Sequence, residues 1–349
     1  MILLRILLFP FSWLYYLLSQ VRNRLYDQGV KPSVSFEVPV ICVGNLTVGG
    51  TGKTPMVEHL IRLLTARHKI ATLSRGYGRT TKGFRIANDD DNASTLGDEP
   101  YQFYRRFGKN ITVAVGEERA LAIPLILQEN SEINVVLLDD AFQHRRVTPA
   151  FSILLTDYYR PFYNDLLLPS GRLRESRWSA RRADVIVVTK CPPDLSEDKR
   201  MGIERSIRQY AEKPVFFASI RYGLPKPFVH SGAKNIQQVI LITGIANSRP
   251  LETYVEQNFG LVRHFVFGDH HQYTAKDIET FLRFAAHYPG VSFLTTEKDS
   301  VKLDIPLFHE LIKGQPFFYL PIEMDFIKSG KDFDEMVLNV VGRGSKEKL

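Results

Sequence analysis

Short runs of apolar, mostly β-branched residues alternate with helical patterns from Pro39 onward. Such runs predict strands that are buried on both faces, and helical stretches between them are typical of crossover connections. The pattern therefore predicts an α/β fold in which a parallel sheet carries helices on both faces. The predicted strands are Val40–Val43, Ile70–Leu73, Ile111–Val115, Val135–Leu138, Ile153–Leu155, Val185–Val188, Val215–Ala218, Val239–Ile242, Phe265–Phe267 and Val291–Leu294. The predicted helices are Lys53–Ala66, Glu117–Gln128, Ser196–Ala211, Pro250–Phe259 and Ala275–His287.

The alternation is interrupted in the second half of the chain by the segment 222–235 (YGLPKPFVHSGAKN). Two prolines and two glycines in this segment are typical of a connection between structural units. We predict a larger unit over residues 26–222 and a smaller C-terminal α/β subdomain over residues 235–349. A catalytic cleft could form between the two units.

The first eighteen residues (MILLRILLFPFSWLYYLL) are apolar except for a few positions, and Arg5 is the only charged residue among them. Arg5 and Pro10 interrupt a stretch that is already shorter than the roughly 20 residues that a spanning helix needs. No small-residue cleavage pattern follows, which argues against a secretory signal peptide. Trp13 and two neighbouring tyrosines favour a hydrophobic helix over residues 1–25 that lies in or dips into a bilayer interface. Packing of this helix on the protein's own core is the alternative.

Composition narrows the class of protein only slightly. The chain has 349 residues, of which 44% are hydrophobic and 24% are charged, and this composition excludes extensive disorder. The formal net charge of +7 indicates an anionic partner but does not choose among a phosphorylated metabolite, an acidic membrane and nucleic acid. The two cysteines, Cys42 and Cys191, are too few for a disulfide framework, so we expect core residues in a reducing compartment.

Residues 43–55 (VGNLTVGGTGKTP) join an apolar strand to a helical pattern through a glycine-rich turn. Backbone amides of such a turn surround phosphate oxygens, and the following helix N-terminus adds partial positive charge. The segment matches G-x-x-x-x-G-K-[ST] except at its first position, and this motif predicts a P-loop NTPase-like sheet. A chance glycine-rich turn is the alternative. The residues expected to bind the phosphates of ATP are Thr47, Val48, Gly49, Gly50, Thr51, Gly52, Lys53 and Thr54, and the Thr54 hydroxyl is also a candidate ligand of Mg²⁺.

A P-loop enzyme needs a second strand that ends in a carboxylate beside the loop. Residues 135–140 (VVLLDD) fit this requirement, and Asp139 and Asp140 are candidate Mg²⁺ residues, with a capping turn as the alternative. His144 follows shortly afterwards, in a segment that could hold water, metal or phosphate or could form a solvated loop. Its role stays open.

Residues 172–182 (RLRESRWSARR) contain five arginines around a single acid, Glu175. Runs of this kind are commonly solvated helix faces. A lone carboxylate among arginines is nevertheless either a third acid on the metal side, which makes Glu175 a further Mg²⁺ candidate, or a structural ion pair.

Phosphoryl transfer to an alcohol calls for a group that accepts the hydroxyl proton. Asp98, in the segment 97–100 (GDEP), is the candidate base, and helix capping is the alternative explanation for it. Two histidines, His270 and His271, follow a predicted strand in the segment 268–273 (GDHHQY). One of them could orient a carboxylate base, but a metal site and an N-cap cluster at Asp269 are also consistent with the pattern.

Taken in order, several motifs resemble those of the tetraacyldisaccharide 4'-kinase family, the lipid A kinases of Gram-negative bacteria. The chain reads GNLTVGGTGKTP, LSRGYGR (Leu73 to Arg79), GDEP, LLDDAFQHRR, LPSGRLRES, FGDHHQYT and TTEKDSVK (Thr295 to Lys302). The resemblance covers most of the chain, and the set of motifs is specific. It implies transfer of the γ-phosphate of ATP to the 4'-hydroxyl of a tetraacylated glucosamine disaccharide 1-phosphate, a step of lipid A biosynthesis.

The resemblance also implies roles for individual residues. Asp98 and His270 correspond to a catalytic dyad, Asp139 and Asp140 to the carboxylate pair that orders Mg²⁺, and Glu175 to an additional acid on the nucleotide or metal side. The implied partners are the acylated disaccharide lipid and the cytoplasmic face of the bacterial inner membrane, to which the protein binds peripherally or monotopically. We expect a monomer without a nucleic-acid partner.

The sequence departs from the family pattern at two points. Ala141 stands where the family commonly has glycine, and His271 directly follows His270, so the choice between the two imidazoles rests on the motif. A second hypothesis is a membrane-associated P-loop GTPase or ATPase of targeting or metal delivery. A GTPase would usually carry an N-K-x-D guanine motif, and the sequence has none. A non-enzymatic ATP-binding module is the third reading, and it would need no base at Asp98.

Overall fold

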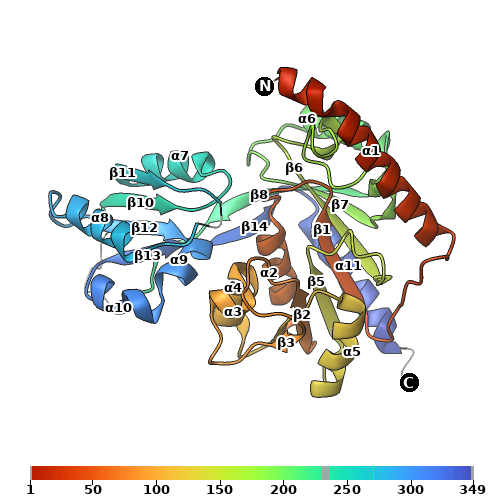
Figure 1. The fold of residues 1–349 in the computed structure, drawn as a ribbon, viewed down its shortest axis with the longest axis horizontal. Coiled ribbons are helices and arrows are strands. Elements are labelled where there is room, and N and C mark those ends of the chain that lie inside the picture. Colours follow the sequence, from red (N-terminus) through yellow and green to blue (C-terminus); the bar gives the residue numbers. More distant parts are fainter. Residues whose placement is uncertain (1, 230–235, 270, 347–349) are drawn as a thin grey trace.

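The computed structural model describes residues 2–229, 236–269 and 271–346, which form two lobes, each built on its own β-sheet (Figure 1). The larger sheet has nine strands in the order β14-β8-β7-β6-β1-β5-β2-β4-β3. Only its edge strands β14 and β3 run antiparallel to their neighbours among the described residues. The strands are β1 (Val40–Asn45), β2 (Ile70–Ser74), β3 (Arg85–Ile86), β4 (Thr112–Val115), β5 (Val135–Asp139), β6 (Phe151–Asp157), β7 (Val185–Thr189), β8 (Val215–Tyr222) and β14 (Ile322–Phe326).

Helices cover both faces of this sheet because its strands bury alternate residues in opposite directions. On one face, Ile41 and Val43 pack with residues of α2, α4 and α11, and on the other, Val40 and Cys42 pack with residues of α5. These observations confirm the predicted α/β class. The helices of this lobe are α1 (Ile2–Asp27), α2 (Lys53–Leu64), α3 (Ala93–Leu96), α4 (Asp98–Phe107), α5 (Arg119–Glu129), α6 (Glu197–Arg208) and α11 (Gly330–Lys346), with 3₁₀ turns η1 (Phe162–Asn164) and η2 (Arg177–Arg182).

The second lobe has a five-stranded sheet in the order β11-β10-β12-β13-β9. It has its own core on both faces, so it is a separate packing unit. The elements of this lobe are β9 (Lys226–Pro227), β10 (Gln238–Thr243), α7 (Arg249–Asn258), β11 (Gly260–Val266), α8 (Ala275–Ala285), β12 (Ser292–Thr296), α9 (Glu297–Leu303), α10 (Pro306–Ile312) and β13 (Phe317–Leu320). The predicted strand Phe265–Phe267 was wrong in its bounds, because β11 begins at Gly260 and is a half-exposed edge strand without a continuous apolar run.

The last part of the chain returns to the first lobe, which differs from the predicted subdomain of residues 235–349. Strand β14 pairs with β8 of the larger sheet, and Phe333, Val337 and Val341 of α11 lie in the same core as α2. The chain therefore leaves the first lobe after β8 and re-enters it at β14, and these two strands pair with each other in the larger sheet. Strand β8 ends at Tyr222, and the chain continues from there to β9 and β10 of the second lobe.

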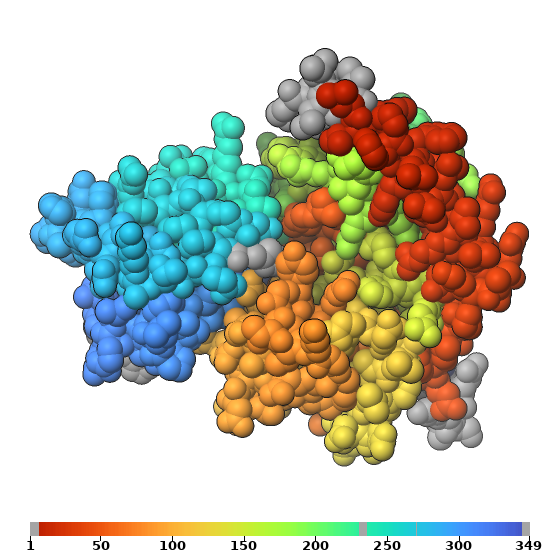
Figure 2. Space-filling model, in the orientation of Figure 1, coloured from red at the N-terminus to blue at the C-terminus, as the bar shows by residue number. Residues whose placement is uncertain are grey.

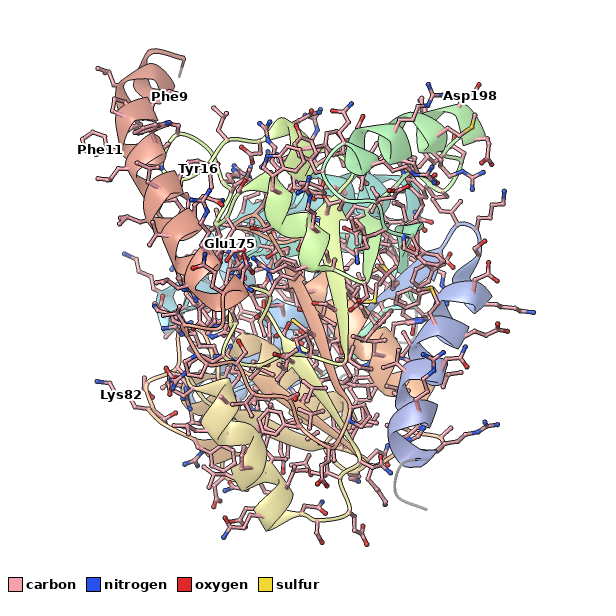
Figure 3. All side chains as sticks on the ribbon, turned by 90° about the vertical axis from the view of Figure 1, so that its right-hand side faces the viewer. Phe9, Phe11, Tyr16, Lys82, Glu175 and Asp198 are labelled. Carbon is pink, nitrogen blue, oxygen red and sulfur yellow. The ribbon has the colours of Figure 1, made fainter. Side chains whose placement is uncertain are left out.

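Helix α1 lies along one side of the first lobe, and its N-terminal turns project past the body of the molecule (Figure 3). Its inner side is fixed by polar contacts: Ser12 Oγ donates to Leu167 O (3.1 Å), and Tyr15 OH donates to Arg174 O (2.8 Å). Its outer side is apolar and exposed, and Phe11 points away from the rest of the molecule. No helix in the described part of the chain is both long enough and apolar enough to cross a membrane.

Candidate active site

The glycine-rich loop lies between β1 and α2, where the sequence predicts a phosphate site. Gly49 (φ 108°) and Gly52 (φ 81°) have left-handed backbone conformations that favour glycine, and the space beside Gly49 and Gly50 is open in the described structure. Gly52 is the N-cap of α2, and because it is glycine it makes no side-chain capping bond to this helix start. Helix α2 therefore presents unpaired backbone N–H groups, which attract an anion.

Contacts from neighbouring strand ends hold the loop in place. Asn45 Nδ2 donates to Thr51 Oγ1 (2.7 Å), and Thr189 Oγ1 donates to Thr51 O (2.9 Å). Lys190 Nζ donates to Gly50 O and also pairs with Asp157 Oδ2 (2.8 Å). Strands β1, β6 and β7 are adjacent and parallel, so the three strands end at one edge of the sheet and brace the loop from there.

The two aspartates at the end of β5 lie beside this loop, because β1 and β5 pair in parallel with Val43 opposite Asp139. Asp139 is buried, and this burial raises the pKa of its carboxyl to about 7; its Oδ2 accepts from Ser74 Oγ (3.3 Å). Asp140 has a left-handed backbone (φ 49°), and Lys53 Nζ lies 3.6 Å from its Oδ1. Burial raises the pKa of the Asp140 carboxyl, but Lys53 and Arg174 outweigh it and lower that pKa to about 2. The two neighbouring carboxyls thus have strongly different proton affinities.

Arg174 connects Asp140 to the strand that precedes the loop. Its guanidinium donates to Asp140 Oδ1 (2.7 Å) and Oδ2 (3.2 Å), and it also donates to Asn45 Oδ1. A guanidinium that binds both oxygens of a carboxylate fixes the orientation of that carboxylate as well as its charge. Arg174 therefore holds Asp140 and Asn45 in one arrangement around Lys53.

Glu175, the next residue, has a different environment. It is buried and its Oε2 pairs with Arg182, which also donates to Phe142 O (3.2 Å). This is the structural ion pair that the sequence left as one of two alternatives for Glu175. Thr54 lies in the first turn of α2. No group of three or more His, Cys, Asp or Glu side chains within the described ranges is arranged to hold a metal ion.

Asp98 is the first residue of α4 and is 6% exposed. The alternative of helix capping does not describe it, because Gly97 is the N-cap of α4. Its Oδ2 lies 3.3 Å from Nζ of Lys302, which belongs to α9 of the second lobe. Lys298 of the same helix lies 3.7 Å from Glu99 Oε1 and 3.5 Å from Asp269 Oδ1. The structure thus brings the segments GDEP and GDHHQY close together, although they belong to different lobes.

Of the two histidines in the second segment, only His271 belongs to the described residues. His270, the predicted partner of Asp98, lies outside the described residues. His271 Nε2 lies 3.3 Å from Asp277 Oδ2, and its ring stacks on Phe267 with 4.3 Å between centroids. Asp277 also forms the capping box of α8 with Thr274, so the N-cap of this helix is not Asp269. His271 is therefore engaged in its own lobe.

His144 is close to the C-terminal end of β5. Burial, together with the nearby guanidinium groups of Arg119 and Arg75, lowers the pKa of its imidazole to about 4. The ring is consequently neutral near pH 7. Cys42 and Cys191 are both buried, which confirms their predicted place in the core.

Comparison with known proteins identifies the family. The family described as tetraacyldisaccharide-1-P 4'-kinase (LpxK) matches residues 4–342. The chain is 43% identical to the tetraacyldisaccharide 4'-kinase of Flavobacterium johnsoniae over 97% of this chain and 98% of that protein. The enzyme of that name from Bacteroides thetaiotaomicron is 40% identical over 97% and 94%, respectively. The chain belongs to the tetraacyldisaccharide-1-P 4'-kinase family.

A solved structure supports the same conclusion for the fold. The crystal structure of LpxK from Aquifex aeolicus, described as a complex with ATP, superposes with a TM-score of 0.77 at 28% sequence identity. The match covers 97% of this chain and 99% of that one. The predicted family and the predicted P-loop-type α/β fold are thereby confirmed.

Several residues that contact the candidate active site of this kinase were not identified from its sequence. Asn45, Thr189 and Lys190 contact the loop, Arg174 contacts Asp140, and Lys302 contacts Asp98. A signal was available for three of them, since Asn45, Thr189 and Lys190 lie at the ends of apolar runs, and polar residues at the ends of parallel strands commonly face ligands. Arg174 could not be distinguished from the other arginines of its segment.

Proposed function

We propose that this protein transfers the γ-phosphate of ATP to the 4'-hydroxyl of tetraacyldisaccharide 1-phosphate, the reaction for which its relatives are named. The observation that carries the proposal is the open glycine-rich loop at the start of α2, with Lys53 beside it, in a chain of this family. Residues 47–54 bind the phosphates through backbone N–H groups and through the Lys53 ammonium group.

The carboxylates at the end of β5 suit a divalent cation that accompanies ATP. Asp139 Oδ1 is buried and has no hydrogen-bond partner among the described residues, and oxygen ligands of this kind are those that Mg²⁺ prefers. Thr54, Asp139 and Asp140 would hold the ion, which supplies positive charge to the phosphate oxygens. Glu175 is less suited because Arg182 neutralises it, so we assign it the structural role of holding Arg182.

In the proposed transfer, the 4'-oxygen forms a bond to the γ-phosphorus while the bond from that phosphorus to the bridging oxygen of ADP breaks. The hydroxyl proton passes to the base, which we assign to Asp98 acting with His270. Asp98 suits this role because it lies at the start of α4 where the two lobes meet. A carboxylate in this position binds the hydroxyl proton as negative charge develops on the attacking oxygen.

The substrate is a lipid, and the shape of α1 fits a place at the cytoplasmic face of the inner membrane. The exposed side of this helix consists of large apolar side chains, and its other side is bonded to the segment that carries Arg174. Such a helix can lie in the interface while the catalytic lobe stays in water. The exposed apolar residues are Leu7, Phe9, Phe11, Trp13, Leu14, Leu17, Leu18 and Val21.

The proposal is tested by incubating the purified protein and its Lys53→Ala variant with labelled ATP and a panel of acceptors. The panel contains the disaccharide lipid, its monosaccharide precursors, simple sugars and phospholipids. Label is expected in the disaccharide lipid only, and the Lys53→Ala variant is expected to lose this transfer. Lys69→Ala, which alters an exposed lysine, is the matched control. Transfer at the normal rate by Lys53→Ala would overturn the assignment of the phosphate site.

A further inference from the structure

One buried ion pair crosses from the second lobe to the proposed base. Lys302 is the last residue of the segment TTEKDSVK, and it lies in α9, directly after β12. Its side chain is 2% exposed, and its Nζ lies 3.3 Å from Asp98 Oδ2 and 3.4 Å from Asp299 Oδ1. A buried ammonium group is stable only when it is paired with opposite charge. The two carboxylates provide that charge, one from each lobe.

The partner from the second lobe is itself firmly held. Asp299 is fully buried, and its Oδ2 accepts from Gly244 N (2.9 Å) and from Thr296 Oγ1 (2.7 Å). Gly244 follows β10 and Thr296 ends β12, so two strand ends of the second sheet position Asp299. Asp299 in turn positions Lys302. The location of the Lys302 ammonium group is therefore a property of the second lobe.

We propose that Lys302 is a positioning residue for the phosphoryl transfer: from the second lobe it fixes the orientation of the Asp98 carboxylate and keeps that carboxylate ionised. This inference rests on the proposed function, because it presupposes that Asp98 accepts the proton. Its consequence is that Asp98 is held for catalysis only while the second lobe is in the arrangement seen in Figure 1. Figure 2 shows a hollow on this face between the two lobes, in which an acceptor could lie near their contact.

Other charged groups also face the contact between Lys302 and Asp98, and their charges affect the pH dependence of kcat. Glu99 lies on α4, Lys298 and Asp299 lie on α9, and Asp269 follows β11. Lys298 Nζ lies 3.7 Å from Glu99 Oε1 and 3.5 Å from Asp269 Oδ1, so it adds positive charge on the same side of α9. The phenol of Tyr273 is also nearby, and burial and then Asp299 raise its pKa, so it stays neutral.

The test compares Lys302→Met with the wild-type enzyme in kcat, in KM for ATP and in the pH dependence of kcat. Loss of a positioning contact is expected to lower kcat about 10- to 100-fold while KM for ATP changes little. A cation next to a carboxylate favours its ionised form by roughly 1–3 pH units, so the acidic limb of kcat is expected to move at least about one unit toward higher pH. Lys302→Arg, which retains the positive charge, is expected to restore the position of this limb.

Two further variants separate positioning from folding. Lys302→Met with Asp299→Asn removes the carboxylate that would otherwise remain buried without its cation, so it is expected to fold stably and to keep the displaced pH profile. Lys313→Met is the matched control, because Lys313 is also three residues from its acidic partner, Glu310, but is exposed in the second lobe. It is expected to behave as wild type.

A Lys302→Met variant with the wild-type kcat and pH profile would overturn the inference. It would also be overturned if the double variant recovered wild-type kinetics, because Lys302 would then only stabilise the fold. Asp98→Asn, measured in parallel, tests the proposed function separately. If Asp98→Asn retains normal turnover, the assignment of the base fails, whereas an inactive Asp98→Asn beside a normal Lys302→Met contradicts the role of Lys302 alone.

Discussion

At the scale of single residues, Arg174 is the group that joins the parts of the phosphate site. Its guanidinium bonds to Asp140, which lies beside Lys53, and to Asn45, which bonds to Thr51 of the loop. Hydrogen bonds to charged groups contribute about 1.5–3 kcal/mol each. Arg174→Met is therefore expected to lower kcat/KM for ATP about 10- to 100-fold, measured by steady-state kinetics with varied ATP.

Arg174→Lys adds a second measurement to the same prediction. Lysine keeps the charge but cannot bind both oxygens of a carboxylate, so it is expected to recover only part of the loss. Arg208→Met is the control, because Arg208 is exposed on α6 and pairs only weakly with Glu204 (3.5 Å). A fully active Arg174→Lys enzyme would show that charge alone is needed at this position.

The residues of the site differ in how far the sequence could predict them. Gly49, Gly52 and Lys53 belong to one short motif whose chemistry is local, so the sequence alone is enough to predict a phosphate site there. The partners of Asp140 could not, because Arg174 reaches it only through the folding of a distant segment. Lys302 could not be predicted either, since its contact with Asp98 depends on how the two lobes pack against each other.

At the scale of elements, most buried parallel strands were predictable, whereas β13 and the edge strands β3, β9 and β14 were not. Strand β5 reads as an uninterrupted apolar run because both of its faces are covered. Strand β14 (IEMDF) alternates, and among its residues only Met324 is buried, so a run of five residues carries little signal. Helix α4 (DEPYQFYRRF) was also missed, because it has few apolar residues and its exposed side is mostly polar. The return of the chain to the first sheet was therefore not visible in the sequence.

A buried charge network links α2, α4 and α9, and it predicts a pH dependence of stability. Glu58 of α2 is 1% exposed and accepts from Arg106 Nη1 (2.6 Å), which also lies 3.0 Å from Glu297 Oε2. Burial, with the neighbouring Glu297 carboxylate, raises the pKa of Glu58 to about 7, although Arg106 and Arg62 oppose the change. The folded protein therefore binds a proton at Glu58 more tightly than the unfolded chain does.

The sign of the effect follows from this difference. The free energy of unfolding is expected to fall as the pH rises from the unfolded-state pKa of Glu58 through its folded-state value of about 7. The Glu58→Gln variant lacks this titration, so its stability relative to wild type is expected to be higher at pH 8 than at pH 5, by roughly 1–3 kcal/mol. Urea denaturation at the two pH values measures the difference, with the exposed Glu310→Gln as control. A relative stability that decreases from pH 5 to pH 8 would mean that the ion pairs outweigh burial.

At the scale of the whole molecule, α1 gives the protein an apolar side that is continuous with its catalytic lobe. The sequence left two alternatives for this helix, an interfacial helix and a helix packed on the core. The structure shows packing contacts on one side, where Ser12 and Tyr15 bond to residues 167–174, and exposed apolar residues on the other. A single apolar stretch could not reveal this division, because the polar partners of Ser12 and Tyr15 come from a distant part of the chain.

The exposed side of α1 predicts how the protein binds lipid. Phe11, Leu14 and Leu18 are 62%, 55% and 63% exposed, so replacing all three with serine removes apolar surface without creating a cavity in the core. The triple variant is expected to keep the wild-type thermal unfolding midpoint and to bind vesicles of phosphatidylethanolamine and phosphatidylglycerol at least about 100-fold more weakly, which sedimentation with the vesicles measures. Leu307→Ser is the control, because Leu307 is 73% exposed on α10 of the second lobe. If the triple variant sediments as wild type does, surfaces other than α1 hold the protein on the membrane, and the proposed place of the active site at the bilayer would require a different orientation of the molecule.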